Sequence, residues 1–535
     1  ITQQTILAAA GAGGDKVYVD DVFSTFAYTG NNSTNTINNG IDLAAEGGLV
    51  WLKNRPDTGG SDNLLFDTER GVAVEISTNQ GRANRSTGTD YGVQSFNSNG
   101  FTFKGNWVGE NASGDPCISW TFRKAPKFFD IVTFSGNGTG NRSISHNLGS
   151  VPGMIFVKQI TGGVRDWVVA HRSLASGSII FLNKTNGSAN ASGTLGIGDA
   201  NNFTVGNNTG YLNVSGCTYV AYLFAHDEAS FGTAGNESII KCGSLTTGSG
   251  GVAEVNLGFE PQWLLVKTST EAGGWVLTDS MRGFVPYGTT GTNSLSPATA
   301  STEGGLSNWG PTSTGFKLSY GGSSGIGMIY MAIRRPHKPL DAFDPPLDAT
   351  DVFAVDTRGG TSPNPPTFYS GFPVDWSLYR NVYGSSYWLS SARLMGDKYV
   401  DTASNNAQNT FSTNLLTYDR MDGMGSDTGS GITLVTWMFK RAPGFFDVVM
   451  YDGSSGTSQN VVHNLGVAPE FIMIKATTSQ RDWATYIAPL GTNKYIELNS
   501  TDAPLTNTGI WNNTAPTSSV FTLGNNYYVN SGGVK

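Results

Sequence analysis

Short apolar runs separated by turn residues follow one another along the whole chain. The run "MIFVK" follows Pro152-Gly153, and "DWVVAH" comes after the next Gly-rich turn, as the two strands of a hairpin would. Further on, "FTVGNNTGYLNVSG" and "TYVAYLFA" are rich in β-branched and aromatic residues, which favour strands. No window of helical period matches these strand signals. The pattern therefore predicts an all-β fold of antiparallel β-sandwiches.

The chain repeats itself. Residues 118–158 align without a gap with residues 435–475, each position shifted by 317, and 16 of the 41 positions are identical. Self-similarity of this kind indicates duplicated modules. The identical positions include Trp120/Trp437, Ala125-Pro126/Ala442-Pro443, Phe128-Phe129-Asp130/Phe445-Phe446-Asp447 and His146-Asn147-Leu148-Gly149/His463-Asn464-Leu465-Gly466.

Apolar runs that end in a basic residue mark five modules. The runs "VPGMIFVK", "EPQWLLVK" and "APEFIMIK" match closely, and "GGLVWLKN" and "FPVDWSLYRN" are diverged versions. They predict five β-sandwiches of roughly 100 residues each. A stretch with four prolines, 336–350, predicts a semi-rigid linker. The modules are module 1 (1–126), module 2 (127–235), module 3 (236–335), module 4 (351–442) and module 5 (443–535), and the basic residues are Lys53, Lys158, Lys267, Arg380 and Lys475.

Module 5 is predicted to be incomplete. It follows module 2 as far as the counterpart of Cys217, and the closing strand Tyr219–Ala225 has no counterpart. A sandwich without one strand exposes unpaired backbone and apolar surface. We expect either that the polypeptide continues past Lys535 or that another chain supplies the strand.

The composition narrows the classes of function. Charged residues make up 14% and the formal net charge is −8, without a basic cluster, so a nucleic-acid partner is not expected. No apolar run approaches the ~18 residues of a transmembrane helix, so no membrane partner is expected either. Three cysteines, Cys117, Cys217 and Cys242, show no metal-ligand spacing. We expect free, packed thiols, no metal and no cofactor.

The tripeptide Arg-Asp-Trp is the candidate ligand-binding motif. A tryptophan can stack on a sugar while the charged pair binds its hydroxyl groups, which would make a glycan site. However, Trp also stands at the equivalent places 275 and 388 of modules 3 and 4, whereas Asp occurs in two modules only. This distribution favours core packing with a local ion pair, and ligand binding remains the alternative. The candidate residues are Arg165, Asp166 and Trp167, and Arg481, Asp482 and Trp483.

Two other recurring motifs are interpreted as structural. His146 and His463 lie in "HNLG", where module 3 has Val255, which favours a hydrogen-bonded turn over general-base catalysis. Asp67 and Arg70, like Asp279 and Arg282, can pair across a turn; one carboxylate is too few for a Ca²⁺ site. The phosphate-binding loop and the HExxH motif are missing from the sequence. No catalytic residue and no enzyme activity are predicted.

Several segments carry a family resemblance. "YVDDVFSTFAYTGN", "GIDLAAEGGLVWLKNR", "AYLFAHDEASFGTAGNESIIKCGS" and "LGFEPQWLLVK" resemble the tandem modules of large, tail-fibre-like virion proteins of marine bacteriophages. Those modules are similar to concanavalin/laminin-G-type, jelly-roll β-sandwiches. The resemblance implies an extracellular structural protein of a phage tail fibre or surface appendage. It also implies other virion proteins as partners, a homotrimer, and recognition of a glycan or protein on the host surface.

Two further interpretations stay open. In the phage interpretation we expect the five sandwiches to follow one another in series as a rod, and a secreted bacterial adhesin or filament subunit could have the same modular build. A glycan depolymerase would need two carboxylates about 5–10 Å apart in one module, and the sequence shows no isolated acidic cluster of that sort.

Overall fold

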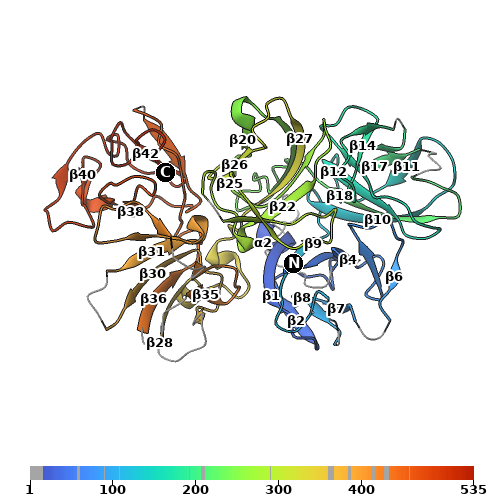
Figure 1. Ribbon diagram of the computed structural model, residues 1–535, viewed down its shortest axis with the longest axis horizontal. Helices are drawn as coiled ribbons and strands as arrows, with labels where there is room; N and C mark the ends of the chain where they lie inside the picture. The colour runs from blue at the N-terminus through green and yellow to red at the C-terminus, as the bar shows by residue number, and fades with distance from the viewer. Residues whose placement is uncertain are drawn as a thin grey trace, which may run out of the picture.

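The chain folds into antiparallel β-sandwiches, as the sequence predicts (Figure 1). The computed structural model describes residues 16–56, 61–88, 91–105, 107, 109–191, 193–206, 211–289, 291–359, 367–383, 387–410, 416–426, 433–456 and 458–535. Every strand pair given below is antiparallel.

Module 1 combines a six-stranded and a three-stranded sheet, preceded by the short helix α2 (Val19–Val22). The order of the larger sheet is β1 (Phe23–Thr29), β9 (Pro116–Arg123), β3 (Gly48–Asn54), β4 (Leu64–Asp67), β5 (Val74–Ser77) and β6 (Arg85–Ser86). The smaller sheet is β2 (Asn35–Asn38), β8 (Gly100–Phe103) and β7 (Val93–Asn97).

Module 2 repeats this arrangement. Its larger sheet is β10 (Phe129–Ser135), β18 (Thr218–Phe224), β12 (Met154–Gln159), β13 (Val168–His171), β14 (Ser178–Phe181) and β15 (Ala189–Asn190). Its smaller sheet is β11 (Arg142–Ser145), β17 (Asn202–Val205) and β16 (Leu195–Gly196). The closing strand β18 pairs with β10 on one side and with β12 on the other.

Module 3 is a shorter version. Four strands form its larger sheet: β19 (Ile240–Thr246), β27 (Gly327–Arg334), β21 (Pro261–Thr268) and β22 (Trp275–Asp279). Three form the second sheet: β20 (Val252–Asn256), β26 (Gly315–Ser319) and β25 (Trp309–Thr312). A two-stranded sheet, β23 (Thr292–Ser294) with β24 (Gly304–Leu306), and the 3₁₀ turns η1 (Ser249–Gly251) and η2 (Ser280–Arg282) complete it.

Module 4 has the strand order of modules 1 and 2. The larger sheet is β28 (Phe353–Gly359), β36 (Thr433–Phe439), β30 (Trp376–Asn381), β31 (Leu389–Ala392), β32 (Lys398–Asp401) and β33 (Asn409–Thr410). The smaller sheet is β29 (Thr367–Tyr369), β35 (Gly423–Ser426) and β34 (Leu416–Thr417). The 3₁₀ turns are η3 (Leu340–Ala342) and η4 (Ala349–Asp351) ahead of β28, and η5 (Arg393–Met395) after β31.

Module 5 consists of three strand pairs in the described residues. They are β37 (Gln459–Val462) with β42 (Val520–Leu523), β38 (Phe471–Ile474) with β39 (Ala484–Ile487), and β40 (Lys494–Tyr495) with β41 (Leu505–Thr506); the 3₁₀ turn η6 (Ala488–Leu490) follows β39. Residues 447–454, which correspond to most of β10, form no strand. In the described residues no strand lies beside them in the place that β18 takes in module 2.

The apolar strands of the larger sheets are buried on both faces. All seven residues of β3 are buried. Val50 and Leu52 pack inside module 1, whereas Leu49 and Trp51 point to the opposite face and belong to a second core. Since neighbouring residues of a strand face opposite sides, a strand between two cores needs a continuous apolar run. This explains why "GLVWLK" does not alternate.

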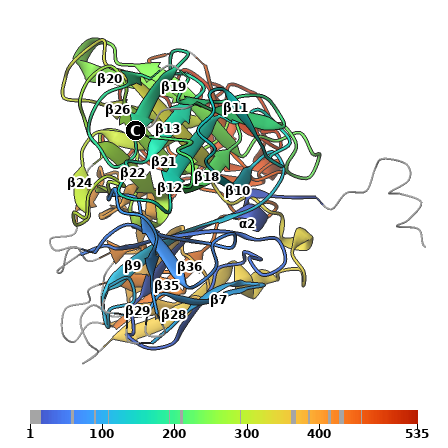
Figure 2. The same ribbon diagram turned by 90° about the vertical axis from the view of Figure 1, so that its right-hand side faces the viewer.

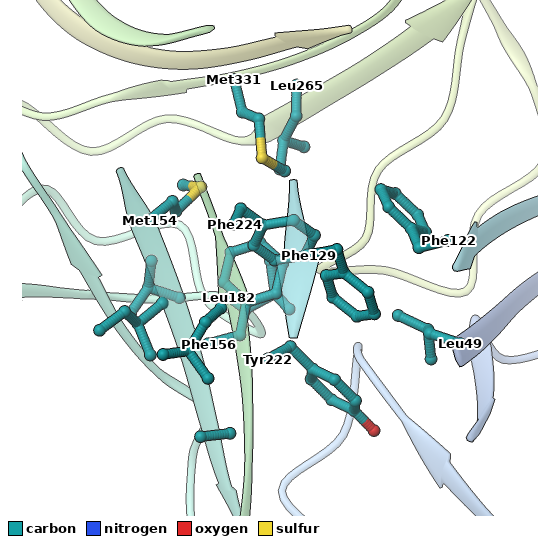
Figure 3. Close-up of a cluster of buried hydrophobic side chains, with 14 of the residues drawn as sticks. Leu49, Phe122, Phe129, Met154, Phe156, Leu182, Tyr222, Phe224, Leu265 and Met331 are labelled. Carbon is teal, nitrogen blue, oxygen red and sulfur yellow. The ribbon is translucent and has the colours of Figure 1, made fainter. Parts of the chain in front are cut away.

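That second core is shared by modules 1, 2 and 3. One cluster of buried side chains runs from Val19 in module 1 through module 2 to Ile333 in module 3. Figure 3 shows part of it, with Leu49 and Phe122 of module 1, Met154 and Phe224 of module 2, and Leu265 and Met331 of module 3. Modules 1–3 are therefore tandem in sequence but not in series in space, and the expectation of a rod is wrong for them. We call modules 1–3 the first set and modules 4 and 5 the second set.

The second set lies against the first, behind it in the view of Figure 2, and buried charges join the two sets. Arg335 of module 3 lies 2.7 Å from Asp447 of module 5, and Arg441 of module 4 lies 2.9 Å from Glu260 of module 3. The linker also contacts the first set, because the backbone N–H groups of His337 and Lys338 donate to the Asp20 carboxylate. The proline-rich segment is thus anchored to α2 at its start.

Candidate functional site

Trp167 of the candidate motif lies in the joint between modules 2 and 1. Its indole is fully buried, and Nε1–H donates to the backbone oxygen of Ser77 in module 1 at 2.8 Å. The ring stacks on Tyr222 with centroids 6.1 Å apart. No face of this ring is open to solvent, so its contacts are those of a packed core residue with a satisfied polar group.

The two charged residues of the motif have separate partners. Asp166 accepts a hydrogen bond from Asn183 at 2.9 Å and lies 2.5 Å from the Lys184 ammonium group. Arg165 donates from its guanidinium group to the backbone oxygen of Val164. The ion pair at this place thus joins Asp166 to Lys184, and the structure does not bring Arg165 and Asp166 together.

The second copy of the motif makes the same kind of joint between modules 5 and 4. Trp483 donates from Nε1 to the backbone oxygen of Asp401 at 3.0 Å. Asp482 accepts from Asn499 at 2.8 Å. Arg481 differs from Arg165, because its guanidinium group lies over the exposed ring of Tyr527, 4.0 Å from the ring centroid.

The first set has a joint of this kind between each pair of its modules, so its three modules form a closed ring of contacts. Trp275 of module 3 donates from Nε1 to the backbone oxygen of Phe181 in module 2 at 2.9 Å. In module 1, Asn63 takes the place of the tryptophan, and its side-chain amide donates to the backbone oxygens of Ser296 and Thr299 in module 3 at 3.1 and 2.8 Å. Module 2 therefore contacts module 1, module 3 contacts module 2, and module 1 contacts module 3.

The strand-ending lysines form a second repeated joint. The sequence showed these residues as module markers, but their role could not be read from spacing alone. Each ammonium group donates to a backbone oxygen of the neighbouring module, and in the first set these contacts follow the same closed order. The pairs are Lys158 with Gly81 (2.9 Å), Lys267 with Thr185 (3.3 Å), Lys53 with Ala300 (3.2 Å) and, in the second set, Lys475 with Asn405 (3.1 Å).

Burial weakens the basicity of these lysines. It lowers the pKa of Lys158, Lys267 and Lys475 to about 8, because the charged form loses hydration at the joint. A lysine of lowered pKa can act as a nucleophile or base. Here each ammonium group is held by backbone oxygens at a module boundary, which accounts for the burial without a reaction.

The acidic residues at strand ends also join modules. Asp279 pairs with Arg282 at 2.6 Å, as predicted, and it accepts a hydrogen bond from Trp120 Nε1 of module 1 at 3.0 Å. Asp67 pairs with Arg70 at 2.6 Å and accepts from the Tyr222 hydroxyl of module 2 at 2.7 Å. Each carboxylate thus binds its own arginine and an aromatic side chain of a neighbouring module.

His171 takes the corresponding place in module 2. The backbone N–H of Ser173 donates to Nδ1 at 3.1 Å, so the neutral ring carries its proton on Nε2, which lies 3.1 Å from the backbone oxygen of Tyr330 in module 3. Burial lowers the pKa of His171 to about 4, and Arg172 and His226 act in the same direction. The joint therefore needs the neutral imidazole.

Acid is expected to weaken this joint. An unfolded histidine binds a proton near pH 6.5, whereas folded His171 resists protonation until about pH 4. Its contribution to stability is fully present above pH 6.5 and is lost as the pH falls toward 4, by up to about 3 kcal/mol. Urea unfolding at pH 7, 6, 5 and 4 should show a steeper loss for the unmodified protein than for His171→Gln. Parallel losses for both proteins would contradict this role of His171.

The two repeated histidines form turns, as predicted. In each motif, the backbone N–H two residues later donates to the histidine Nδ1 at 3.2 Å, from Leu148 to His146 and from Leu465 to His463. The three cysteines are free and buried. Burial raises the pKa of Cys117 and Cys242 well above the usual range of a thiol, which makes them poor nucleophiles.

An apolar groove of about 360 Å³ lies in the second set, at the place of the missing closing strand. Residues 448–451 form one wall and β38 the other, with Trp376 and Trp483 among the lining side chains. In module 2 the same space is filled by β18, between β10 and β12. The lining of the groove includes Val448, Met450, Tyr451, Ile472 and Ile474.

The described part of the chain contains no group of three or more His, Cys, Asp and Glu side chains that could hold a metal ion. No helix in the described ranges is both long and apolar enough to cross a lipid bilayer.

Comparison with known sequences identifies one family. A family model described as "Domain of unknown function (DUF7483)" matches residues 19–336 and 375–534. The first range starts at α2 and ends just past β27, so it covers the first set; the second range covers most of modules 4 and 5. No curated protein sequence matches the chain.

Proposed function

We propose that this chain, which belongs to the DUF7483 family, is a structural component of a bacteriophage virion, in a tail fibre or surface appendage. The proposal starts from the resemblance of its segments to tail-fibre-like virion proteins. It includes an extracellular location on the particle, other virion proteins as partners, and a homotrimeric assembly.

One structural observation supports a structural role over a catalytic one. The repeated polar residues of the first set bind the backbone or side chains of neighbouring modules: the strand-ending lysines, the indole donors and the strand-end carboxylates. Asp279 illustrates this, since both of its carboxylate oxygens are engaged with Arg282, Trp120 or backbone N–H groups. Residues that hold modules together are expected in a protein that must keep its shape outside the cell.

Glu110 is the described carboxyl group that most resembles a general acid. Burial raises its pKa to about 8, so it stays protonated at neutral pH. Its side chain lies in the core of module 1 and is 2% exposed, which leaves it out of reach of a polysaccharide. This arrangement supports the structural proposal over a depolymerase.

Recognition of the host surface belongs to the same proposal. Module 4 exposes three tyrosines, Tyr369, Tyr383 and Tyr387, at 51%, 78% and 61%. Exposed aromatic rings offer an apolar face and a polar tip, which suits contact with a glycan or protein.

Loss of these rings is expected to weaken host binding. On an array of host capsule and lipopolysaccharide fragments, Tyr383→Ala with Tyr387→Ala should reduce binding by about 30-fold, since each of the two contacts contributes roughly 1 kcal/mol. Tyr527→Ala is the matched control, because Tyr527 is similarly exposed at 56% but lies in module 5. Equal binding by all variants would remove these tyrosines from the proposal.

Immunogold electron microscopy tests the virion assignment. Antibodies against the chain are applied to purified phage particles, with a phage that lacks the gene as the control. Label along tail appendages is the expected result, and label on the capsid would make the protein a head decoration. Unlabelled particles would overturn the virion assignment and favour the adhesin or filament subunit.

A further inference from the structure

The two sets differ at the face that module 3 covers in the first set. Trp120 is fully buried, whereas its duplicate Trp437 is 40% exposed. Met154 is likewise fully buried, and its duplicate Phe471 is 53% exposed. We call the surface around Trp437 and Phe471 the open face of the second set. Because these residues occupy equivalent places in equivalent strands, the difference must come from what packs against them.

A third position shows the same contrast. Asn183 and Asn499 are equivalent, since each accepts a hydrogen bond from the backbone N–H of the repeated tryptophan. The residue before each is a leucine. Leu182 is fully buried, whereas Leu498 is 41% exposed and belongs to the open face.

Module 3 supplies the cover in the first set. Asp279 accepts the Trp120 hydrogen bond, and the Arg282 guanidinium group lies 5.5 Å from the centre of the Trp120 ring. Met154 belongs to the buried cluster that includes Leu265 and Met331 of module 3 (Figure 3). The described residues of the second set include no third sandwich in the corresponding place.

The groove in module 5 leads to this face, and Lys535 lies at its mouth. The backbone N–H of Gly453 donates to the Val534 oxygen at 2.8 Å, and that of Thr477 donates to the Lys535 oxygen at 2.7 Å. In module 2, Gly136 and Ile160 make the same bonds to Cys217 and Thr218, at 2.7 and 2.9 Å.

These bonds fix the register of whatever fills the groove. Thr218 is the first residue of the closing strand β18, so Lys535 occupies the first position of the corresponding strand. A strand that enters the groove from Lys535 would run between residues 448–451 and β38, as β18 runs between β10 and β12.

We propose that the groove and the open face form one docking seat. Its occupant is a β-strand in the register of β18, followed by a sandwich of the module 3 type. This inference is independent of the proposed function. The strand satisfies the free edge of β38, and the sandwich covers Trp437, Phe471 and Leu498, so that the second set becomes a closed three-module unit like the first.

A segment of this chain serves as the probe for the docking seat. A copy of residues 219–335 is appended after Lys535, which places the closing strand of module 2 and all of module 3 in register with the seat. Leu498→Cys is introduced into the extended and the original chain, and maleimide labelling is followed by intact mass. The native cysteines Cys117, Cys217 and Cys242 are buried.

The proposed docking predicts that the added segment protects position 498, and not position 151, from maleimide labelling. Labelling of Cys at position 498 should slow by about 100-fold in the extended chain. The maleimide can then reach the thiol only when the added sandwich opens locally. Val151→Cys is the matched control, since Val151 is 49% exposed in module 2 and should react equally in both chains. A folded extended chain that labels at position 498 at the original rate would overturn the proposal.

A shorter extension keeps the test decisive if the long one does not fold. With residues 219–225 alone appended, hydrogen exchange of the backbone amides of β38 should slow by about tenfold or more, while position 498 still reacts. Unchanged exchange in β38 would overturn the strand part. If the original chain protects position 498 by dimerising at micromolar concentration, a second copy is the occupant and the proposed one is wrong.

Discussion

Replacing Trp120 by alanine is expected to lower the free energy of unfolding of the first set by about 3–5 kcal/mol. The side chain is fully buried between modules 1 and 3, packs edge-on against Trp51, and donates to Asp279. Its removal leaves a cavity in the shared core and deprives the Asp279 carboxylate of a donor. Urea unfolding, followed by near-ultraviolet circular dichroism, measures the loss.

The duplicate Trp437 is the matched control. It stands at the equivalent place in β36, but it is 40% exposed, and no third module covers it in the part of the chain that the structure describes. Trp437→Ala should therefore cost only about 1 kcal/mol, the usual size for a partly exposed side chain. Equal losses for the two variants would mean that module 3 contributes little to the burial of Trp120 and would contradict the shared core.

Replacing Asp279 by alanine is expected to destabilise the first set by about 3–5 kcal/mol, because it leaves a buried arginine without its main partner. Both side chains of the Asp279–Arg282 pair are fully buried, 2.6 Å apart. Glu303 lies 2.8 Å from Arg282 and still neutralises part of the Arg282 charge in the variant. Thermal unfolding of the variant measures the effect.

Two controls separate burial from charge in this prediction. Glu69→Ala breaks the more exposed pair between Glu69 and Lys124 and should cost less than about 1 kcal/mol. The double variant Asp279→Leu with Arg282→Met removes both charges and should recover much of the loss. A double variant as unstable as Asp279→Ala would show that the charges themselves hold the joint.

The strands, turns and local pairs could be predicted because they depend on neighbours in the sequence. Asp67 and Arg70 are three residues apart, and the bond to each repeated histidine spans two residues. The apolar runs also predicted the strands, because a buried strand needs no partner from another module to be recognised.

The closed arrangement of modules 1–3 could not be predicted, since it depends on contacts between distant residues. Lys53 and Ala300, for example, are 247 positions apart and meet only in the fold. One signal was present: the runs ending in Lys53, Lys158 and Lys267 are apolar at successive positions, which indicates burial on both faces. The sequence also showed Trp167 as a packing residue, but not that it packs across a joint.

Native-state hydrogen exchange tests the shared core most directly. Exchange of the backbone amides is measured by mass spectrometry across increasing denaturant. The closing strands β9, β18 and β27 should converge on one common free energy of opening, because a single core holds all three. The amides of β38 and β39, beside the empty groove, should open at a lower free energy. Three separate values for β9, β18 and β27 would show that the modules unfold independently and would contradict the account.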